Sequence, residues 1–390
     1  MEEIDIPSII NRAVHFLEGK GYESYDQFDA LCSPLIGFLT RPSDFLRRVA
    51  IQINKNIPIN VRPVLGYRPM IHTKTVSDML SVYAYLYSST SQVRWKDKAR
   101  KMYDLLMARS LDFDRGVGWG LNFPYTTRFT NAASKTPNLY NTLNAGHALL
   151  DGYSLLDSAD IQSTIRSIVS FMFDYLGVVE IDKSTMWFRY YPNQKIPNFN
   201  VNATAASFFL RANRSLGDPI VPSEIIDGLL NLLMKYQNHD GSWYYTPSEN
   251  GKWIDGYHTG FILDALLYLQ EVGYDYPLQA PLKKAIEFYV RELFTTEGIP
   301  KFYSHRLYPI EAQNCAQAIQ TLSKCVIQGQ FCDKHFLQKV VHQTITHLYD
   351  PSGYFYYKKD RLWTNRQFYS RWSHTPMILA MIYYKQLGGS

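Results

Sequence analysis

The chain has 390 residues, 46% of them hydrophobic and 19% charged, so it can form a large folded core and lacks the composition of a disordered protein. Its formal net charge of +5 includes no block of like charge, which argues against a nucleic-acid-binding protein but leaves room for an anionic ligand. The four cysteines form neither CxxC pairs nor a disulfide framework, as expected for a reducing compartment.

The first residues, MEEIDIPSIINRAV, lack the charged segment followed by an apolar segment that marks a secretory signal. No uninterrupted apolar run reaches the roughly 18 residues that a membrane-spanning helix needs. We therefore expect a soluble, cytoplasmic protein without a transmembrane segment. The sequence does not fix its oligomeric state.

Apolar residues recur with the period of an α-helix along most of the chain. The stretch 54–69 holds prolines at positions 58, 63 and 69, and this composition predicts a boundary between an N-terminal helical cap (1–65) and a main domain (66–390). Helices are expected at residues 6–18, 42–54, 76–87, 95–109, 143–156, 161–175, 203–215, 223–236, 258–271, 281–293, 312–325, 336–348 and 375–386.

Two kinds of helix alternate in the main domain. Residues 258–271 are apolar around most of the helix, which suits an inner helix buried on several sides. Residues 281–293 carry several lysines, glutamates and arginines, which suits an outer helix. About six such pairs follow residue 70, the last of them incomplete, so we expect an all-α fold closed into an (α/α)6 helical toroid.

An aromatic turn recurs between the helices. The leading aromatic residues of these turns stand at positions 119, 187, 243, 302 and 355, at intervals of 68, 56, 59 and 53 residues. Each turn is followed by a loop and then by an apolar helix with a polar first turn. Minor hairpins are expected at residues 242–246 and 354–358.

The inner helices of a toroid begin at one end, so their free backbone N–H groups and positive dipole ends meet at a common mouth that favours anionic groups. Polar side chains are concentrated at these helix starts. The catalytic candidates are His258, Tyr257, Asp255, Glu311 and Arg371. The substrate-binding candidates are Trp119, Asn144, His147, Trp187, Tyr191, Asn202, Trp243, Asn314, Trp372 and His374.

Many of these candidates also have a purely structural explanation. Asn202, Asp255 and Glu311 suit helix caps or partners of the helix dipole. A tryptophan that follows a glycine can simply plug the turn. A histidine at a helix start, such as His258, is harder to explain in this way and suits a neutral base or acceptor.

Motifs for the common cofactors and metals are absent. The sequence has no Walker A motif, no Rossmann glycine pattern, no HExxH and no Gly-x-Ser-x-Gly. Cys315, Cys325 and Cys332 near His335 are not spaced as zinc ligands. We therefore expect neither a metal nor a cofactor.

Two phrases of the sequence resemble known families. The segment QNHDGSW (237–243) resembles the QW repeat of terpene cyclases and their toroid relatives, although the acidic motifs of terpene cyclases are not evident. The segment WIDGYHTGF (253–261) resembles a signature of bacterial polysaccharide-biosynthesis proteins of the VpsJ-like type, and the similarity covers roughly residues 70–390. This resemblance implies a toroid like those of glucuronyl C5-epimerases and polysaccharide lyases, in an exopolysaccharide or capsule context.

The favoured hypothesis is an enzyme that epimerises, eliminates or hydrolyses a glycan or sugar intermediate at the mouth. In an epimerase or lyase, His258 and Tyr257 would exchange a proton next to a carboxylate, and Arg371 would stabilise the enolate. In a hydrolase, Asp255 and Glu311 would be the carboxylate pair. The alternatives are a non-catalytic glycan-binding or scaffold protein and a toroid enzyme with a lipid-linked or terpenoid substrate.

Overall fold

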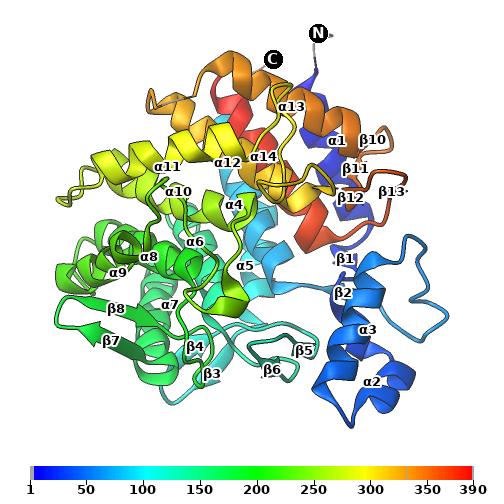
Figure 1. Cartoon of the computed structure of the whole chain (residues 1–390), viewed down its shortest axis with the longest axis horizontal. Helices are drawn as coiled ribbons and strands as arrows, with labels where there is room; N and C mark the ends of the chain where they lie inside the picture. Colours follow the sequence, from blue (N-terminus) through cyan, green and yellow to red (C-terminus); the bar gives the residue numbers. More distant parts are fainter. Residues whose placement is uncertain (1–3, 331, 389–390) are drawn as a thin grey trace.

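A closed ring of helices dominates the computed structural model, which describes residues 4–330 and 332–388 (Figure 1). In the described part of the chain, each inner helix contacts the next one in sequence, and the last returns to the first. The inner helices are α4 (Thr73–Thr90), α6 (Leu139–Asp151), α8 (Phe199–Leu216), α10 (Gly256–Glu271), α12 (Ala312–Ile327) and α14 (Thr375–Gln386).

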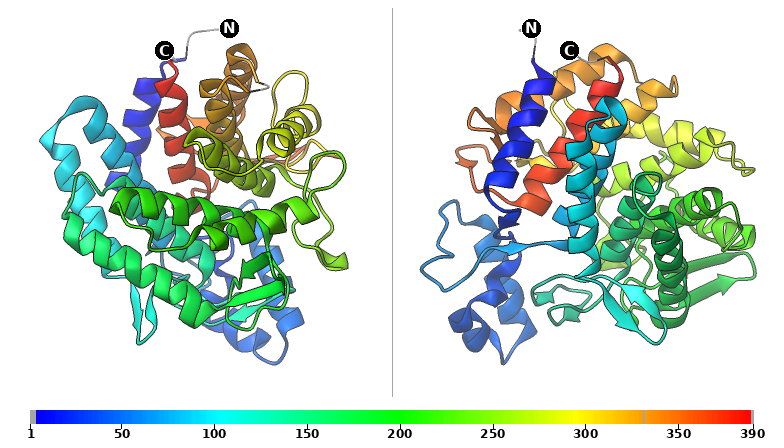
Figure 2. Two further views of the ribbon diagram at one scale, coloured as in Figure 1. Left: turned by 90° about the vertical axis from the view of Figure 1, so that its left-hand side faces the viewer. Right: turned by 180° about the vertical axis from the view of Figure 1, so that it is seen from behind.

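An outer helix packs against each inner helix. The outer helices that follow their inner partners in sequence are α5 (Val93–Met107), α7 (Ser158–Ser170), α9 (Ser223–Tyr236), α11 (Gln279–Glu292) and α13 (Lys334–Leu348). The sixth outer helix comes from the other end of the chain, because α1 (Ile6–Gly19) packs against α14 (Figure 2). The predicted (α/α)6 toroid is therefore confirmed, and α1 completes the pair that the sequence left incomplete.

The inner helices are buried on several sides, as their composition indicates. Leu267 and Leu269 on α10 are completely buried although they point to nearly opposite sides of the helix. Several inner helices begin two to four residues earlier than predicted, since their first turns carry polar residues that interrupt the apolar period. Asn141 and Asn200 are examples, and both are buried in the first turn of their helices.

Short antiparallel strands occupy the loops between helices. The pairs are β1 (Glu23–Ser24) with β2 (Met70–Ile71), β3 (Leu111–Phe113) with β4 (Gly116–Gly118), β5 (Tyr125–Thr126) with β6 (Asn131–Ala132), β7 (Val178–Asp182) with β8 (Thr185–Phe188), β10 (Tyr349–Asp350) with β11 (Tyr354–Phe355), and the sheet β13 (Thr364–Asn365), β12 (Lys358–Lys359), β9 (Ile310–Glu311). Residues 242–246 adopt an irregular turn rather than the expected hairpin.

Two further helices, α2 (Pro34–Thr40) and α3 (Asp44–Asn56), stand outside the ring at the edge of the molecule (Figures 1 and 2). They pack against each other and on the short helical turn η1 (Asp29–Cys32). The domain boundary near residue 65 stays a prediction. Within the described residues, no helix is long and apolar enough to cross a membrane.

Candidate functional site

The N-cap residues of the inner helices gather polar groups at the mouth of the toroid. Asp255 caps α10 by accepting a hydrogen bond of 2.8 Å from the backbone N–H of His258. Glu311 caps α12 in the same way, with a hydrogen bond of 3.0 Å from the N–H of Asn314. Each cap satisfies a backbone donor that the helix leaves free and places a carboxylate at the positive end of the helix dipole.

His258 and Asp255 form a dyad that opens to solvent. Asp255 Oδ2 lies 2.7 Å from His258 Nδ1 and also accepts a hydrogen bond of 3.1 Å from the indole of Trp253. The side chain of Asp255 is 1% exposed, whereas that of His258 is 26% exposed. An acceptor on Nδ1 favours the tautomer whose Nε2 is free to take a proton, and no described residue bonds to Nε2. The dyad therefore presents an oriented imidazole base.

Tyrosine rings surround this imidazole. The rings of Tyr245 and Tyr257 lie 4.6 and 5.0 Å from that of His258, and Trp253 stacks on Tyr245 at 4.7 Å. The hydroxyls of Tyr257 and Tyr140 share a hydrogen bond of 2.9 Å. Burial raises the pKa of Tyr245 and Tyr257, but Tyr245, Trp253 and Tyr140 keep partly exposed rings. Enclosed hydroxyls next to accessible ring faces suit the binding of a sugar.

Glu311 is linked to Tyr257 through Trp372. Its carboxylate accepts a hydrogen bond from the indole of Trp372, whose ring lies 5.9 Å from that of Tyr257. Burial raises the pKa of Glu311 to about 7, because the hydrogen bonds from Asn314 and Trp372 offset only part of the desolvation. Glu311 can therefore hold a proton near neutral pH.

Lys55 brings a positive charge to the same region. It extends from α3, and its ammonium lies 5.2 Å from the ring of Phe28, which in turn contacts Trp372. Burial lowers the pKa of Lys55, while the nearby carboxylate of Glu311 opposes this effect. Among the described residues Lys55 forms no ion pair, and an anionic ligand bound beside it would favour the charged form of its side chain as Glu311 does.

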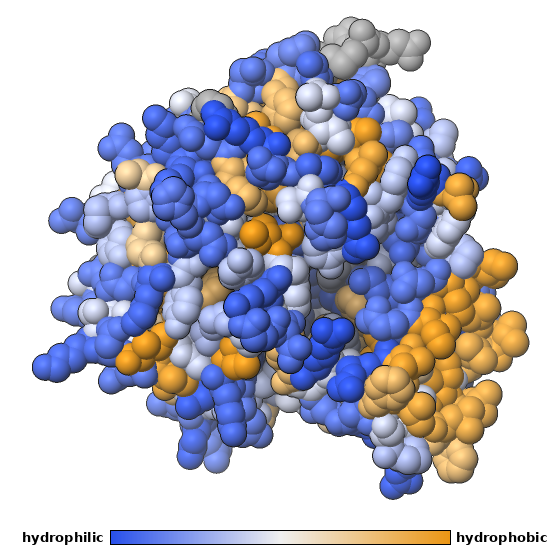
Figure 3. Space-filling view, viewed as in Figure 1, coloured by the Kyte–Doolittle hydropathy of each residue, from blue (hydrophilic) through white to orange (hydrophobic). Residues whose placement is uncertain are grey.

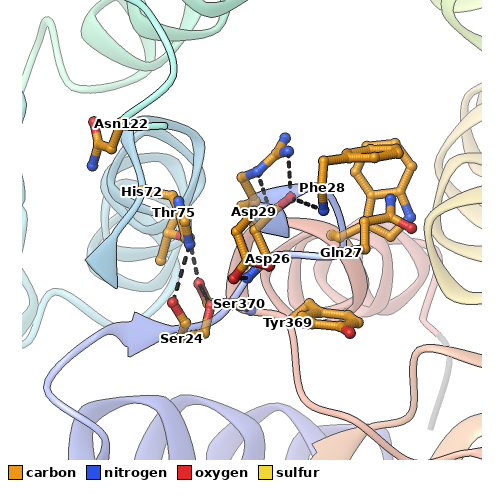
Figure 4. A network of polar contacts seen from close by, with 12 residues as sticks. Ser24, Asp26, Gln27, Phe28, Asp29, His72, Thr75, Asn122, Tyr369 and Ser370 are labelled. Carbon is orange, nitrogen blue, oxygen red and sulfur yellow. Dashed lines mark hydrogen bonds and ion pairs between the residues drawn. The ribbon is translucent and has the colours of Figure 1, made fainter. Parts of the chain in front are cut away.

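Arg371 lies in the turn η4 (Ser370–His374) at the start of α14, but its charge is already paired. Its guanidinium donates two hydrogen bonds to Asp26, the one from Nη2 being 2.9 Å long, and both side chains are buried. Burial alone would raise the pKa of Asp26, yet Arg371 and His72 lower it below its usual value. The hydroxyls of Ser24, Thr75 and Ser370 bond to one another beside this pair (Figure 4).

Other predicted binding residues form the walls of the toroid. Trp119 and Trp243 are buried, and their indoles donate hydrogen bonds of 2.9 and 2.8 Å to the last turns of α5 and α9. Trp187 is also buried. These indoles fill the aromatic turns and offer no face to a ligand. Three further candidates form hydrogen bonds within the wall. Asn202 accepts one from the backbone N–H of Phe188, and the ring of His374 bonds to the carbonyl of Ala13. The hydroxyl of Tyr191 accepts one from Asn138.

Asn144 and His147 face a cavity of about 440 Å³ that runs along the axis of the ring. Phe261 lines this cavity and also packs on Tyr257 at 4.9 Å, and Lys74, Gln313 and Pro376 line it from the first turns of three inner helices. Six charged side chains of the cavity wall form ion pairs with one another, namely Lys74 with Asp78, Arg211 with Asp151, and Lys324 with Asp264. The buried Nε2 of His147 and Oε1 of Gln313, both on the cavity wall, have no hydrogen-bond partner among the described residues, so the cavity also holds polar groups that a ligand could meet.

Sequence reasoning missed several residues of the mouth. Tyr245 lies two residues after Trp243, and Trp253 lies two residues before Asp255. Alternate residues of an extended segment share a side, so this spacing could have indicated that both belong to the mouth. Asp26, Lys55 and His72 come from the first 72 residues, and no local pattern connects them with the mouth. Among the described residues, no group of three or more His, Cys, Asp or Glu is placed to hold a metal.

Several solved structures with the same fold are described as carbohydrate-active enzymes. A polysaccharide lyase superposes with a TM-score of 0.64 and 11% identity, over 99% of this chain and 98% of that one. Cellobiose 2-epimerase from Spirochaeta thermophila superposes with a TM-score of 0.58 and 12% identity, over 81% of this chain and 86% of that one. A possible member of the GH105 family from Salmonella enterica superposes with a TM-score of 0.63 and 10% identity, over 98% of this chain and 94% of that one. No family model matches the sequence, and neither does any curated protein.

Proposed function

We propose that the protein is an enzyme that modifies a glycan or sugar intermediate by proton transfer at the mouth of the toroid. The observation that carries this proposal is the His258–Asp255 dyad, whose imidazole lies against the rings of Tyr245 and Tyr257, with Glu311 linked to Tyr257 through Trp372. Solved structures of the same fold described as a lyase and as epimerases support the substrate class.

In the proposed reaction, His258 Nε2 removes the proton from a sugar carbon next to a carboxylate or carbonyl group. The electron pair of the broken C–H bond moves into that group as an enolate, which Lys55 stabilises by its charge. Protonated Glu311 then acts as the acid. It either protonates the same carbon on the opposite face, which epimerises the sugar, or protonates a leaving oxygen on the adjacent carbon, which eliminates it.

A hydrolase with Asp255 and Glu311 as its carboxylate pair is less compatible with the geometry. Asp255 Oδ1 accepts the N–H of His258, and Oδ2 accepts both the imidazole and the indole of Trp253. A carboxylate in this state is buried and occupied, so it cannot attack a sugar or activate a water without breaking the helix cap. Its role is to orient His258, and the proton passes through the imidazole.

The biological context belongs to the same proposal. The segment at residues 253–261 supports a role in exopolysaccharide or capsule synthesis through its resemblance to the VpsJ-like proteins, and we place the enzyme in the cytoplasm. The unpaired charge of Lys55 at the mouth favours an anionic sugar, such as a glycan that contains uronic acids. The charge of Arg371 is neutralised by Asp26, so Arg371 contributes to the wall of the mouth. Lys55, rather than Arg371, is the cation that we propose stabilises the enolate.

The test is hydrogen exchange in D2O. The wild-type chain is incubated with uronic-acid oligosaccharides, neutral disaccharides and nucleotide sugars, and NMR follows deuterium incorporation next to the carboxylate or carbonyl carbon. The matched variants are His258→Ala and His335→Ala, the latter an exposed histidine on the outer helix α13. Exchange with one substrate class that is lost only in His258→Ala supports the proposal. Binding of a glycan without exchange in the wild type would instead indicate a non-catalytic glycan-binding protein.

A further inference from the structure

Helices α2 and α3 carry an apolar surface that faces solvent. Phe38 is 74% exposed, Phe45 62% and Ile53 56%. Together with Leu35, Leu39 and Val49 they form the apolar hairpin face, which appears as a continuous orange area over α2 and α3 in Figure 3. An exposed apolar patch of this kind on a folded protein marks a contact surface.

The orientation of α3 shows that this exposure follows from its sequence pattern. Phe45, Val49 and Ile53 recur at intervals of four residues and share the outward face of the helix. The opposite face holds Asn54, which bonds to Asp29 at 3.0 Å, and Lys55, which reaches the mouth. The inward face is mixed, because Ile51 is buried there beside Asn54, whereas the outward face carries three exposed apolar residues.

The charges around the apolar hairpin face are positive. Residues 33–69 contain six cationic residues and one acidic residue, Asp44, but Arg62 is buried in an ion pair with Asp29 and Lys55 turns toward the mouth, so four arginines remain for this surface. Arg41 and Arg68 are exposed, and neither forms an ion pair with a described residue. Arg47 donates a hydrogen bond to Asn131 and forms an ion pair of 3.6 Å with Asp44, and Arg48 donates a hydrogen bond to the carbonyl of Thr127. An amphipathic surface with apolar rings at its centre and arginines at its edge matches an anionic membrane surface.

We propose that the apolar hairpin face docks on the headgroup region of a bilayer that contains anionic phospholipid. The two helices project from the ring (Figures 1 and 2), and a convex surface can enter a lipid interface but cannot hold a peptide as a groove does. A second copy of the chain fits less well, because a twofold contact would bring the arginines of both copies together.

The mouth lies next to this surface. Asp44 on α3 accepts a hydrogen bond of 2.8 Å from Asn131 in β6, and Lys55 on α3 lies close to Glu311. Docking would therefore bring the mouth near the lipid headgroups. If the proposed function holds, this position suits a glycan that is carried on a lipid anchor.

The test is co-sedimentation of the full chain with phosphatidylcholine vesicles, with and without phosphatidylglycerol. The wild type should bind the anionic vesicles, and more weakly as salt is added. The double substitution Phe38→Ser with Phe45→Ser should weaken binding by at least about tenfold. Arg41→Gln and Arg68→Gln should each weaken binding to anionic vesicles by about fivefold.

The matched control is the double substitution Val93→Ser with Ile327→Ser, which removes two exposed apolar residues near the C-terminal ends of inner helices α4 and α12. It should bind as the wild type does, and circular dichroism checks that all variants are folded. Equal binding by all variants, or no binding by the wild type, overturns the proposal. So does a wild-type dimer in analytical ultracentrifugation that the Phe38/Phe45 variant converts to a monomer. The assay uses no glycan, so its outcome is independent of the proposed chemistry.

Discussion

Arg371 and Asp26 form a buried ion pair between positions 345 residues apart in the sequence. Asp26 belongs to the loop that follows β1, and Arg371 opens the last inner helix, so the pair ties the N-terminal segment to the end of the ring where α1 packs on α14. The same pair forms one wall of the mouth beside the hydroxyl network of Ser24 and Ser370. Closure of the toroid and formation of the mouth thus depend on the same contact.

Breaking this pair should cost much more stability than breaking an exposed one. Asp26→Asn leaves the guanidinium of Arg371 buried without a counter-charge, and we expect a loss of about 3–5 kcal/mol in the free energy of unfolding. Arg166→Met breaks the exposed pair with Asp218 and should cost less than about 1 kcal/mol. Urea unfolding measures both. Similar losses for the two variants would show that the buried pair has no special role in closing the ring.

Asp255→Asn should separate the orienting role of Asp255 from its role as a helix cap. An asparagine still caps α10, but its amide can donate to His258 Nδ1 and so stabilise the tautomer whose Nε2 carries the proton. We expect kcat to fall by roughly 10²–10⁴ with little change in KM. The control is Asp333→Asn, because Asp333 caps the outer helix α13 without a histidine partner.

Both variants should remain folded in thermal unfolding. Turnover by Asp255→Asn equal to that of Asp333→Asn would remove the dyad from the proposed mechanism. Loss of activity together with loss of folding in Asp255→Asn alone would mean that the cap, rather than the orientation of His258, is the main contribution.

Glu311 should make stability depend on pH. Its pKa is 4.5 in an unperturbed chain and about 7 in the folded protein. Between these values the folded state holds a proton that the unfolded state has lost, so stability falls as the pH rises through this window. At about 1.36 kcal/mol per pKa unit, the loss in the free energy of unfolding amounts to roughly 3 kcal/mol. This loss is complete above pH 7 and absent below pH 4.5.

Glu311→Gln removes this titration and leaves a constant offset from one altered hydrogen bond. The free energy of unfolding of the variant, measured relative to that of the wild type, should therefore rise by up to about 3 kcal/mol from acidic to mildly alkaline pH. Urea unfolding across this range gives the difference, with the exposed Glu292→Gln as a control. A constant difference between wild type and Glu311→Gln at all pH values would mean that Glu311 ionises normally.

The ring could be predicted from the sequence because its signal is local and repeated. Apolar inner helices, amphipathic outer helices and aromatic turns recur along the chain, and each repeat buries its neighbour. The pairing of α1 with α14 could not be predicted, since the contact joins the two ends of the chain. The exposed face of α3 was also missed, because an amphipathic pattern does not reveal which side faces the protein.

The mouth was predictable where it is built from helix caps. Asp255, Tyr257, His258 and Glu311 lie at helix starts, and parallel inner helices must bring their starts together. Lys55 reaches the same place from outside the ring, through a tertiary contact that no spacing encodes. The tryptophans selected as sugar platforms mostly fill the turns, because a buried indole with one N–H donor satisfies the free carbonyls at a helix end.

Trp243 and Trp253 provide a direct test of this division between wall and mouth. Trp243 is buried and donates to Leu233 in the last turn of α9, whereas Trp253 is partly exposed and donates to Asp255. Trp243→Phe should lower the free energy of unfolding by about 1–3 kcal/mol, because it leaves a buried carbonyl without its donor, and should not change kcat. Trp253→Phe should change stability by less than about 1 kcal/mol but lower kcat, since one of the bonds that hold the Asp255 carboxylate is lost. Urea unfolding and the turnover assay are run on both variants. A loss of activity in Trp243→Phe with intact folding, or an unchanged kcat in Trp253→Phe, would place the boundary of the mouth elsewhere than at the Asp255–His258 dyad.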